Sequence, residues 1–290
     1  MLDIKTTPIE NLREHLVYKR QPPIFDSQIS QFQSSLNGNR ETDPNEIMPL
    51  YLKTFDSWLH NSKLNRLDGL SALPYRDFCV GVTGYLDDLY VRYGDKIRYY
   101  ARDYSYHWRL GVGKKVEHYS ELKKDDQFIL STPFCYFGDK HPYIDDILDH
   151  CDSEQVHVHI DSAWYGCVKD FVFDYQRPCI KSAGFSLSKG LSSGHNRMGV
   201  RYAKSREVGP ITIVNDFNMA VTHLMWLGVQ LMNEYSCDYL QNKYGVAYMQ
   251  LCKKLNLRAT NAIHTAFGYL PNNNEEEVPV GVSSILKKMI

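Results

Sequence analysis

The feature that most constrains the fold is an alternation of short apolar segments with helix-like ones in the middle of the chain. Apolar runs typical of strands occur at 79–82, 96–100, 127–130, 155–160, 180–185 and 198–203. After the first run, apolar residues recur at helical spacing, as at Leu86, Leu89 and Tyr93, and a second helix is predicted over 143–150. Strands that alternate with helices predict a three-layer α/β/α fold with a central, mostly parallel sheet.

Charge and cysteine usage exclude several classes of protein. The 290 residues include 33 Lys and Arg against 34 Asp and Glu, a formal charge of −1, so nothing favours a general nucleic-acid or membrane-surface binder. No apolar run approaches the roughly 20 residues of a membrane helix, and the N-terminal residues lack a signal-peptide core. The seven cysteines show no C-x-x-C pair, which argues against a zinc ribbon or a thioredoxin motif. We therefore expect a cytoplasmic protein with reduced, buried cysteines.

Three polar loops follow predicted strands, where ligands bind in sheets of this kind. The first, Thr83-Gly84-Tyr85, follows the strand that is predicted to end at Val82 and opens a helix. The free N–H groups and positive end of such a helix form an anion site. The alternative for this segment alone is a simple helix start.

The second loop begins with Asp161, directly after the alternating segment at 155–160, and continues through Trp164. A carboxylate at the carboxyl end of a buried strand is poorly solvated and needs a cationic partner. Helix capping or a buried salt bridge is the alternative role for this aspartate.

The third loop contains Ser186, Ser188 and Lys189, and Arg197 follows eight residues after the lysine. Among small and apolar residues a lysine amine is desolvated and weakly basic, so it can attack an aldehyde. The serines and the arginine offer donors for a phosphate. The alternative is a solvated loop.

Together the three loops match the needs of a phosphorylated aldehyde cofactor that contains a ring nitrogen. Lys189 would form the imine, Asp161 would keep the ring nitrogen protonated, and the remaining donors would hold the phosphate. A protonated ring stabilises a carbanion at the α-carbon of an amino acid.

The same segments resemble the fold type I family of pyridoxal 5'-phosphate (PLP) enzymes, the aspartate aminotransferase superfamily, in its class I/II branch. The family's D-x-A-Y-like, S-x-S-K and R-x-G motifs correspond here to Asp161-Ser-Ala-Trp, Ser186-Leu-Ser-Lys and Arg197-Met-Gly. The turn at 94–97 resembles the family's G-D-x-V turn, which leads to an aromatic residue that stacks on the cofactor. Tyr104 is the best-placed residue for that role and Trp108 the second. The resemblance covers residues 70–205.

The resemblance implies PLP as the cofactor, a small-molecule amino-group substrate and a homodimer, because active sites of this family generally lie at a subunit interface. It implies Lys189 and Asp161 as the catalytic residues. The cofactor-binding residues that it implies are Thr83, Gly84, Tyr85, Tyr104, Cys135, Asp161, Trp164, Ser186, Ser188, Lys189 and Arg197.

The chain also departs from the family pattern. In the family motif N-P-x-N-P-T-G the second asparagine bonds the ring oxygen of the cofactor, and Cys135 stands in its place. Trp164 stands where the family has a tyrosine with the same role, and the neighbouring Tyr165 would point elsewhere. The family's longer C-terminal domain supplies an arginine for the substrate carboxylate, whereas here Arg258 is the only arginine after Arg206 and nothing in its sequence context identifies it.

We therefore divide the chain into an N-terminal arm or accessory segment (1–60), a large PLP-binding α/β domain (61–210) and a C-terminal part (211–290). Periodicity predicts two helices within 215–255, broken near Ser236 or Gly245, which would contribute to an interface. The C-terminal part would also hold a reduced small domain, in which 272–277 is a solvated loop and 282–290 a short helix or strand.

The predicted function is that of a PLP-dependent enzyme that acts on an amino acid or amine through Lys189, most simply an aminotransferase. Another PLP reaction, such as that of a decarboxylase or lyase, and a catalytically silent protein with this fold are alternatives. A metal-dependent hydrolase is a third, because His157, His159 and Asp161 alternate and so share one face of a strand. The competing interpretation of the two histidines is packing on a partly buried strand face.

Overall fold

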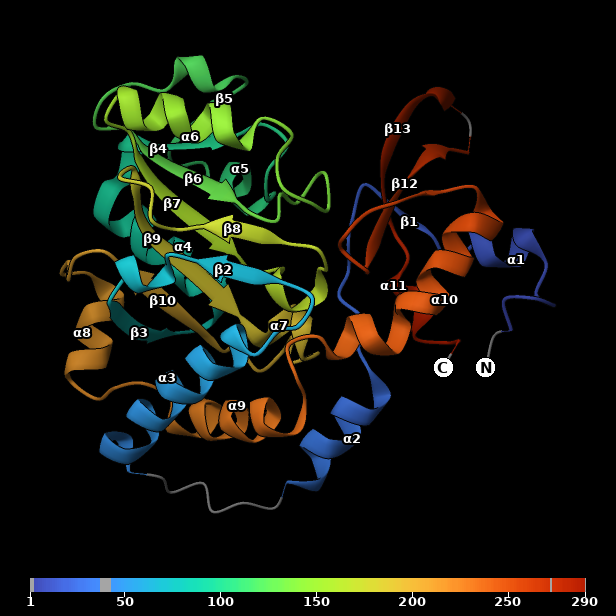
Figure 1. The fold of residues 1–290 in the computed structure, drawn as a ribbon, viewed down its shortest axis with the longest axis horizontal. Coiled ribbons are helices and arrows are strands. Elements are labelled where there is room, and N and C mark those ends of the chain that lie inside the picture. Colours follow the sequence, from blue (N-terminus) through green and yellow to red (C-terminus); the bar gives the residue numbers. More distant parts are fainter. Residues whose placement is uncertain (1–2, 37–42, 272, 290) are drawn as a thin grey trace.

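The structure is a computed structural model that describes residues 3–36, 43–271 and 273–289 (Figure 1). Its larger part is built around a seven-stranded sheet. In spatial order the strands are β3 (Tyr75–Cys79), β10 (Gly199–Ala203), β9 (Ile180–Ser186), β7 (His157–Ser162), β6 (Gln127–Ser131), β4 (Ile97–Tyr100) and β5 (Lys114–Val116).

Most of this sheet is parallel. Neighbouring strands from β9 through β7, β6 and β4 to β5 all pair in parallel. Only β10 runs against its neighbours, since it pairs antiparallel with both β9 and β3. The predicted central, mostly parallel sheet is confirmed.

Both faces of the sheet are covered by apolar side chains. Along β6, Phe128 and Leu130 belong to one buried cluster, whereas Ile129 between them belongs to a second cluster together with Leu86 of the helix α4 (Gly81–Tyr93). Successive side chains of a strand point to opposite faces, so the sheet lies between two helical layers. The helices of the larger part are α3 (Pro44–His60), α4 (Gly81–Tyr93), α5 (Tyr106–Leu110), α6 (Ile144–Ser153), α7 (Leu187–Gly190), α8 (Pro210–Asp216) and α9 (Thr222–Glu234).

A second, four-stranded antiparallel sheet forms the smaller part, to the right in Figure 1. Its strands are β1 (Val17–Tyr18), β13 (Asn273–Gly281), β12 (Thr265–Leu270) and β11 (Arg258–Ala259). In this sheet Val17 pairs with Gly281, so segments from the two ends of the chain lie side by side. The remaining elements are α1 (Ile9–Arg13), α2 (Ser27–Ser35), α10 (Tyr239–Leu255), α11 (Ser283–Leu286) and the parallel pair β2 (Arg66–Asp68) and β8 (Val172–Asp174).

Two of the predicted boundaries are wrong. The first strand does not continue to Val82: β3 ends at Cys79, and Gly81, with a left-handed φ of 64°, starts α4. The polar run at 272–277 is not a loop over its described residues, since β13 begins at Asn273 and pairs with β12 (Asn272 itself lies outside the described residues). Pairing with a neighbouring strand supplies the backbone hydrogen bonds that the polar sequence alone does not suggest.

The C-terminal helices follow the prediction more closely. Helices α9 and α10 are separated between Glu234 and Tyr239, which confirms the break near Ser236, and the last described segment contains the short helix α11. Over the described ranges, no helix has the length and apolar character required to cross a bilayer.

Candidate active site

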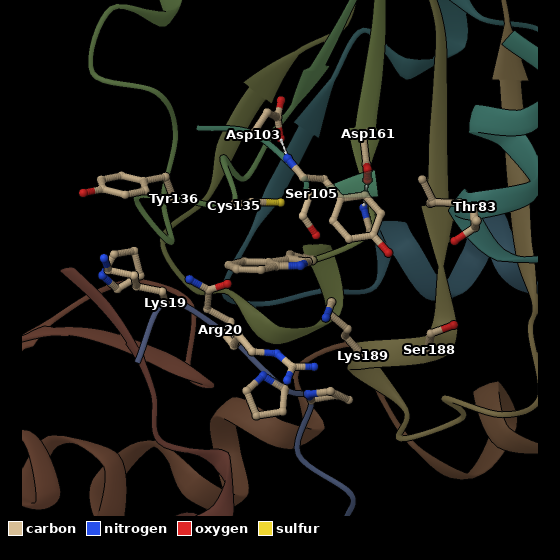
Figure 2. A pocket seen from close by; sticks show the side chains of 18 of the residues that line it. Lys19, Arg20, Thr83, Asp103, Ser105, Cys135, Tyr136, Asp161, Ser188 and Lys189 are labelled. Atoms are coloured by element: carbon tan, nitrogen blue, oxygen red, sulfur yellow. Dashed lines mark hydrogen bonds between the residues drawn. The ribbon is translucent and has the colours of Figure 1, made fainter. Parts of the chain in front are cut away.

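A cavity of about 980 Å³ lies where the carboxyl ends of the parallel strands face the smaller sheet (Figure 2). Loops that follow β4, β6, β7 and β9 form one wall, and the N-terminal segment together with β13 forms another. The predicted site residues on its lining are Thr83, Tyr104, Cys135, Asp161, Trp164, Ser186, Ser188, Lys189 and Arg197.

The Arg197 side chain links the segment after β9 to the first turn of α4. Its guanidinium donates to the Ser188 hydroxyl at 3.1 Å and to the Thr83 hydroxyl at 2.8 Å. The Ser186 hydroxyl in turn donates to Ser188 at 2.9 Å. A guanidinium flanked by hydroxyl groups at the start of α4 could hold a phosphate ester.

Lys189 lies in α7, which directly follows β9, and its side chain reaches into the cavity (Figure 2). Burial lowers the pKa of its amine below the usual lysine value. The amine lies 5.4 Å from the ring centre of Trp164. Loss of contact with water disfavours the charged ammonium, so the amine of a buried lysine is more often in its neutral, nucleophilic form.

The helix that carries Lys189 is held close to the loop after β7. A side-chain carbon on Gly190 would lie 2.8 Å from the Cα of Gly166, and the reverse distance is also 2.8 Å. Only glycine at both positions allows this backbone approach, which fixes Lys189 relative to Trp164 and Asp161.

Asp161 is the penultimate residue of β7 and is 4% exposed. Burial, with a further contribution from the nearby Asp103, raises the pKa of its carboxyl to about 7, although a hydrogen bond from the Ala163 amide and the charges of Lys189 and Arg197 oppose the shift. A carboxyl that changes charge near neutral pH is suited to share a proton with a ring nitrogen.

Asp103 was not predicted from the sequence, yet it organises two loops of the site. Its carboxylate accepts hydrogen bonds from the Ser131 amide at 3.0 Å and from the Ser131 hydroxyl, and it also accepts from the Tyr104 amide at 2.7 Å. Ser131 accepts from the Cys135 amide at 3.2 Å. Asp103 follows β4 at its carboxyl end, so the same rule that singled out Asp161 would have found it.

Not every predicted residue reaches the cavity. Gly84 and Tyr85 are absent from its lining: the Gly84 amide donates to Val80 within the helix start, and the Tyr85 side chain is fully buried against Gly184. The Tyr85 hydroxyl shares a hydrogen bond with Ser182. The early start of α4 explains this difference, since it turns residue 85 toward the sheet. Both candidates for the stacking aromatic, Tyr104 and Trp108, line the cavity.

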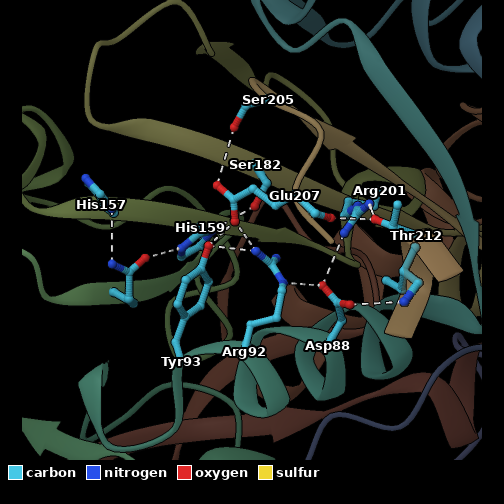
Figure 3. A network of polar contacts seen from close by, with 12 residues as sticks. Asp88, Arg92, Tyr93, His157, His159, Ser182, Arg201, Ser205, Glu207 and Thr212 are labelled. Atoms are coloured by element: carbon cyan, nitrogen blue, oxygen red, sulfur yellow. Dashed lines mark hydrogen bonds and ion pairs between the residues drawn. The ribbon is translucent and has the colours of Figure 1, made fainter. Parts of the chain in front are cut away.

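The two strand histidines lie in a different network, on the face of the sheet that α4 covers (Figure 3). His159 is hydrogen-bonded to Ser182 at 2.7 Å and to Gln127 at 3.0 Å, and Gln127 also bonds His157. Burial holds the pKa of His159 well below its usual value. Among the residues that the structure describes, no group of three or more His, Cys, Asp or Glu side chains could hold a metal ion, which contradicts the metal-site alternative.

The structure also shows where Tyr165 and Arg258 lie, the two other residues at which the chain was compared with the family pattern. Tyr165 points away from the cavity and donates to the Leu59 carbonyl at 3.1 Å. Arg258 lies outside the cavity, where it bonds Glu277 at 2.8 Å. The cavity instead receives Lys19 and Arg20 from the N-terminal segment, residues for which the local sequence gives no signal because their position depends on β13.

Comparison with known proteins supports the architecture. No protein-family model and no curated protein matches the chain. Among solved structures, the aromatic aminotransferase from Pyrococcus horikoshii OT3 is similar, with a TM-score of 0.63, 14% identity and 97% of this chain and 96% of that chain covered. Apo-BacF from Bacillus subtilis gives a TM-score of 0.62 at 12% identity, covering 93% of this chain and 89% of that one.

A third similar structure is the PLP-bound C-S lyase from Staphylococcus hominis, with a TM-score of 0.56, 10% identity and coverage of 94% and 89% of the two chains. At such identities the likeness concerns the fold. The chain therefore has the three-layer α/β fold of these aminotransferases and lyases.

Proposed function

We propose that the protein is a PLP-dependent enzyme that acts on an amino-group substrate, most simply an aminotransferase. The observation that carries this proposal is the convergence of Lys189, Asp161 and the Arg197–Ser188–Thr83 cluster in one cavity. These groups match the aldehyde, the ring nitrogen and the phosphate of PLP in chemistry. Bound PLP would supply an electron-withdrawing ring that stabilises negative charge at the substrate α-carbon.

Within this site, Lys189 would hold the aldehyde carbon and then carry a proton to or from the α-carbon as general base and acid. Its lowered pKa supports this role, because only the neutral amine can accept a proton. Asp161 would keep the ring nitrogen protonated, and Tyr104 would stack on the ring face.

The surroundings of the ring oxygen would differ from those in the family. Cys135 occupies the place of the asparagine, and burial raises the pKa of its thiol well above the usual value, so that the thiol stays neutral. A neutral thiol is a weak hydrogen-bond donor. The ring oxygen would therefore receive less stabilisation from this chain.

The first test is a spectrum of the purified protein after incubation with PLP. We expect an absorbance band at about 410–430 nm, as for lysine-bound PLP, and borohydride reduction should attach the cofactor to the peptide that contains Lys189. Lys189→Ala should abolish turnover and labelling, whereas Lys181→Ala, outside the cavity, should retain both. Activity that survives in Lys189→Ala would exclude this mechanism.

The second test separates transfer from elimination. An aminotransferase requires a 2-oxo acid as acceptor, whereas a lyase releases ammonia without one. We expect turnover of amino acids that depends on the acceptor. Ammonia release in its absence would assign a lyase reaction to the same site.

We also propose a homodimer, in line with the resemblance. Light scattering during size-exclusion chromatography should give twice the 33.7 kDa of one chain. A monomer that binds PLP and turns over substrate would contradict this part of the proposal alone.

A further inference from the structure

Two consecutive cations, Lys19 and Arg20, line the cavity opposite the polar loops of the large sheet. Neighbouring side chains on a regular strand point to opposite faces, so such a pair would normally be split. Here Lys19, directly after β1, has a left-handed φ of 58°. This change of backbone direction ends the alternation, and both side chains line the same space.

A left-handed conformation is unfavourable for a lysine, and such residues cluster at functional sites, where the surrounding structure holds them in place. The contacts around Lys19 do so. Its amide donates to the Pro279 carbonyl at 2.8 Å, and the Ser283 hydroxyl donates to the Pro22 carbonyl. A side-chain carbon on Gly281 would lie 2.6 Å from the carbonyl oxygen of Arg20, so the segment packs directly against the backbone of β13.

The charges in the cavity leave this pair without a counter-ion. Arg197 is bonded to Ser188 and Thr83, and Arg102 pairs with Glu276 at 3.6 Å. The carboxylate of Asp103 is occupied by Ser131 and Tyr104. Within the described ranges, the side chains of Lys19 and Arg20 have no hydrogen bond or ion pair.

One member of the pair, Arg20, is also drawn on the same side of the cavity as Lys189. Figure 2 draws Arg20 and Lys189 in the same region, away from Asp103 and Asp161. A substrate whose amino group meets Lys189 would therefore bring its other groups toward Arg20. A guanidinium binds a carboxylate through two parallel hydrogen bonds, and a lysine adds a point charge.

We propose that Lys19 and Arg20 form an anion clamp that binds a carboxylate of the substrate, and so select amino acids against simple amines. This inference rests on the proposed function, because it requires an amino-group substrate at Lys189. The clamp would place carboxylate recognition in the N-terminal segment. Arg258 would have no part in it, because its side chain is paired with Glu277 outside the cavity.

The test uses the PLP-loaded protein and four ligands: L-glutamate, L-alanine, 4-aminobutyrate and ethylamine. They carry two carboxylates, an α-carboxylate only, a distal carboxylate only, and none. Binding is measured both by the change in cofactor absorbance and by calorimetry. We expect Arg20→Gln to weaken binding of at least one carboxylate-bearing ligand roughly 10- to 100-fold and to leave ethylamine unchanged; which ligand is affected identifies the α- or the distal carboxylate.

Lys19→Gly provides the second variant, because glycine accepts the left-handed backbone while the whole lysine side chain, with its amine, is removed. We expect it to weaken the same ligand by a smaller factor. The matched control is Arg13→Gln, which removes a cation of the N-terminal segment that does not line the cavity and should change no affinity. Melting temperatures of all variants report whether each protein is folded.

The possible results are distinct. If the wild-type protein binds no PLP, the proposed function fails. If it binds PLP but Arg20→Gln affects ethylamine and the carboxylates equally, or none of them, the clamp is wrong while the proposed function stands. Loss of PLP affinity in Arg20→Gln would assign the guanidinium to the cofactor and would also overturn the clamp.

Discussion

At the scale of single residues, protonation of the Asp161 carboxyl should make the free energy of unfolding depend on pH. Its pKa of about 7 in the folded chain exceeds the ordinary aspartate pKa of 3.8, so between these values the folded state holds a proton that the unfolded state has lost. Excess protons on the folded state make stability fall as pH rises. This carboxyl should therefore destabilise the cofactor-free protein progressively from about pH 4 to 7.

Asp161→Asn removes that titration while it can still accept the Ala163 hydrogen bond. In urea unfolding between pH 4.5 and 7.5, the wild-type protein should lose stability relative to the variant, at a slope approaching about 1.4 kcal/mol per pH unit. Parallel curves for the two proteins would show that Asp161 ionises normally.

Arg197 allows a phosphate-specific prediction. Arg197→Gln should weaken binding of PLP roughly 10- to 100-fold, because it removes a charge-assisted contact to the phosphate. Pyridoxal, which lacks the phosphate, is the matched control and should bind both proteins equally. Equal weakening of the two ligands in absorbance titrations would place the phosphate elsewhere.

Residues that follow strands were the most predictable part of the site. Asp161, Ser188 and Lys189 were found because their segments end strands of a parallel sheet, and Asp103 was accessible to the same rule. Arg20 was not, since the local sequence says nothing about which distant strand the N-terminal segment joins. The prediction that Tyr85 binds the cofactor was wrong because the direction of its side chain depends on the residue at which α4 begins. The sequence does not fix that residue, and α4 begins at Gly81, before the predicted end of the strand.

At the scale of elements, the contact of α7 with the loop after β7 determines where Lys189 lies. Gly190→Ala would force a side-chain carbon to within 2.8 Å of the Gly166 Cα, so the two segments must separate. We expect a loss of about 1–3 kcal/mol in unfolding free energy together with weaker PLP binding.

Gly245→Ala is the matched control for this substitution. In α10 the nearest atom to the added carbon is Gln241 Oε1 at 3.9 Å, so nothing has to move. Alanine should stabilise this helix by about 0.5–1 kcal/mol, measured by urea unfolding. If both variants behaved alike, the close approach at Gly190 would not be a constraint.

Predictions of elements succeeded where apolar periodicity was strong. Periodicity predicts β4, β6, β7, β9 and β10, and the break between α9 and α10 is one of the two positions that it allows, whereas the short strands β5 and β8 give no such signal. The run at 272–277 shows the opposite case: asparagine and glutamate disfavour a strand locally, and pairing with β12 overrides that preference.

At the scale of the whole molecule, Asp26 joins the N-terminal segment to α10. It is 0% exposed and accepts hydrogen bonds from the Ile29 amide at 3.0 Å, from the Lys243 amine at 2.5 Å and from the Tyr244 hydroxyl. Burial by itself would raise the pKa of its carboxyl, but the bonds from Lys243 and Tyr244 outweigh this and lower the pKa. Its stabilising effect is therefore present at neutral pH and is lost as pH falls through the lowered pKa.

Asp26→Ala should cost about 3–5 kcal/mol of unfolding free energy at pH 7, because it leaves a partly buried ammonium unpaired. Asp43→Ala removes another helix-capping aspartate, at the exposed start of α3, and should cost only about 1 kcal/mol. Equal losses in denaturant unfolding would show that Asp26 acts as a cap alone.

The pairing of β1 with β13 has a consequence for biosynthesis. While the ribosome is still making the chain, the segment that contains Lys19 and Arg20 has no strand to join, because Gly281 and Ser283 have not yet been translated. The large sheet and Lys189 can be in place by then, but the cavity still lacks a wall. Selectivity among ligands would thus be acquired only after β13 has been made, and a polypeptide that terminates before residue 273 would retain the reactive amine without the clamp.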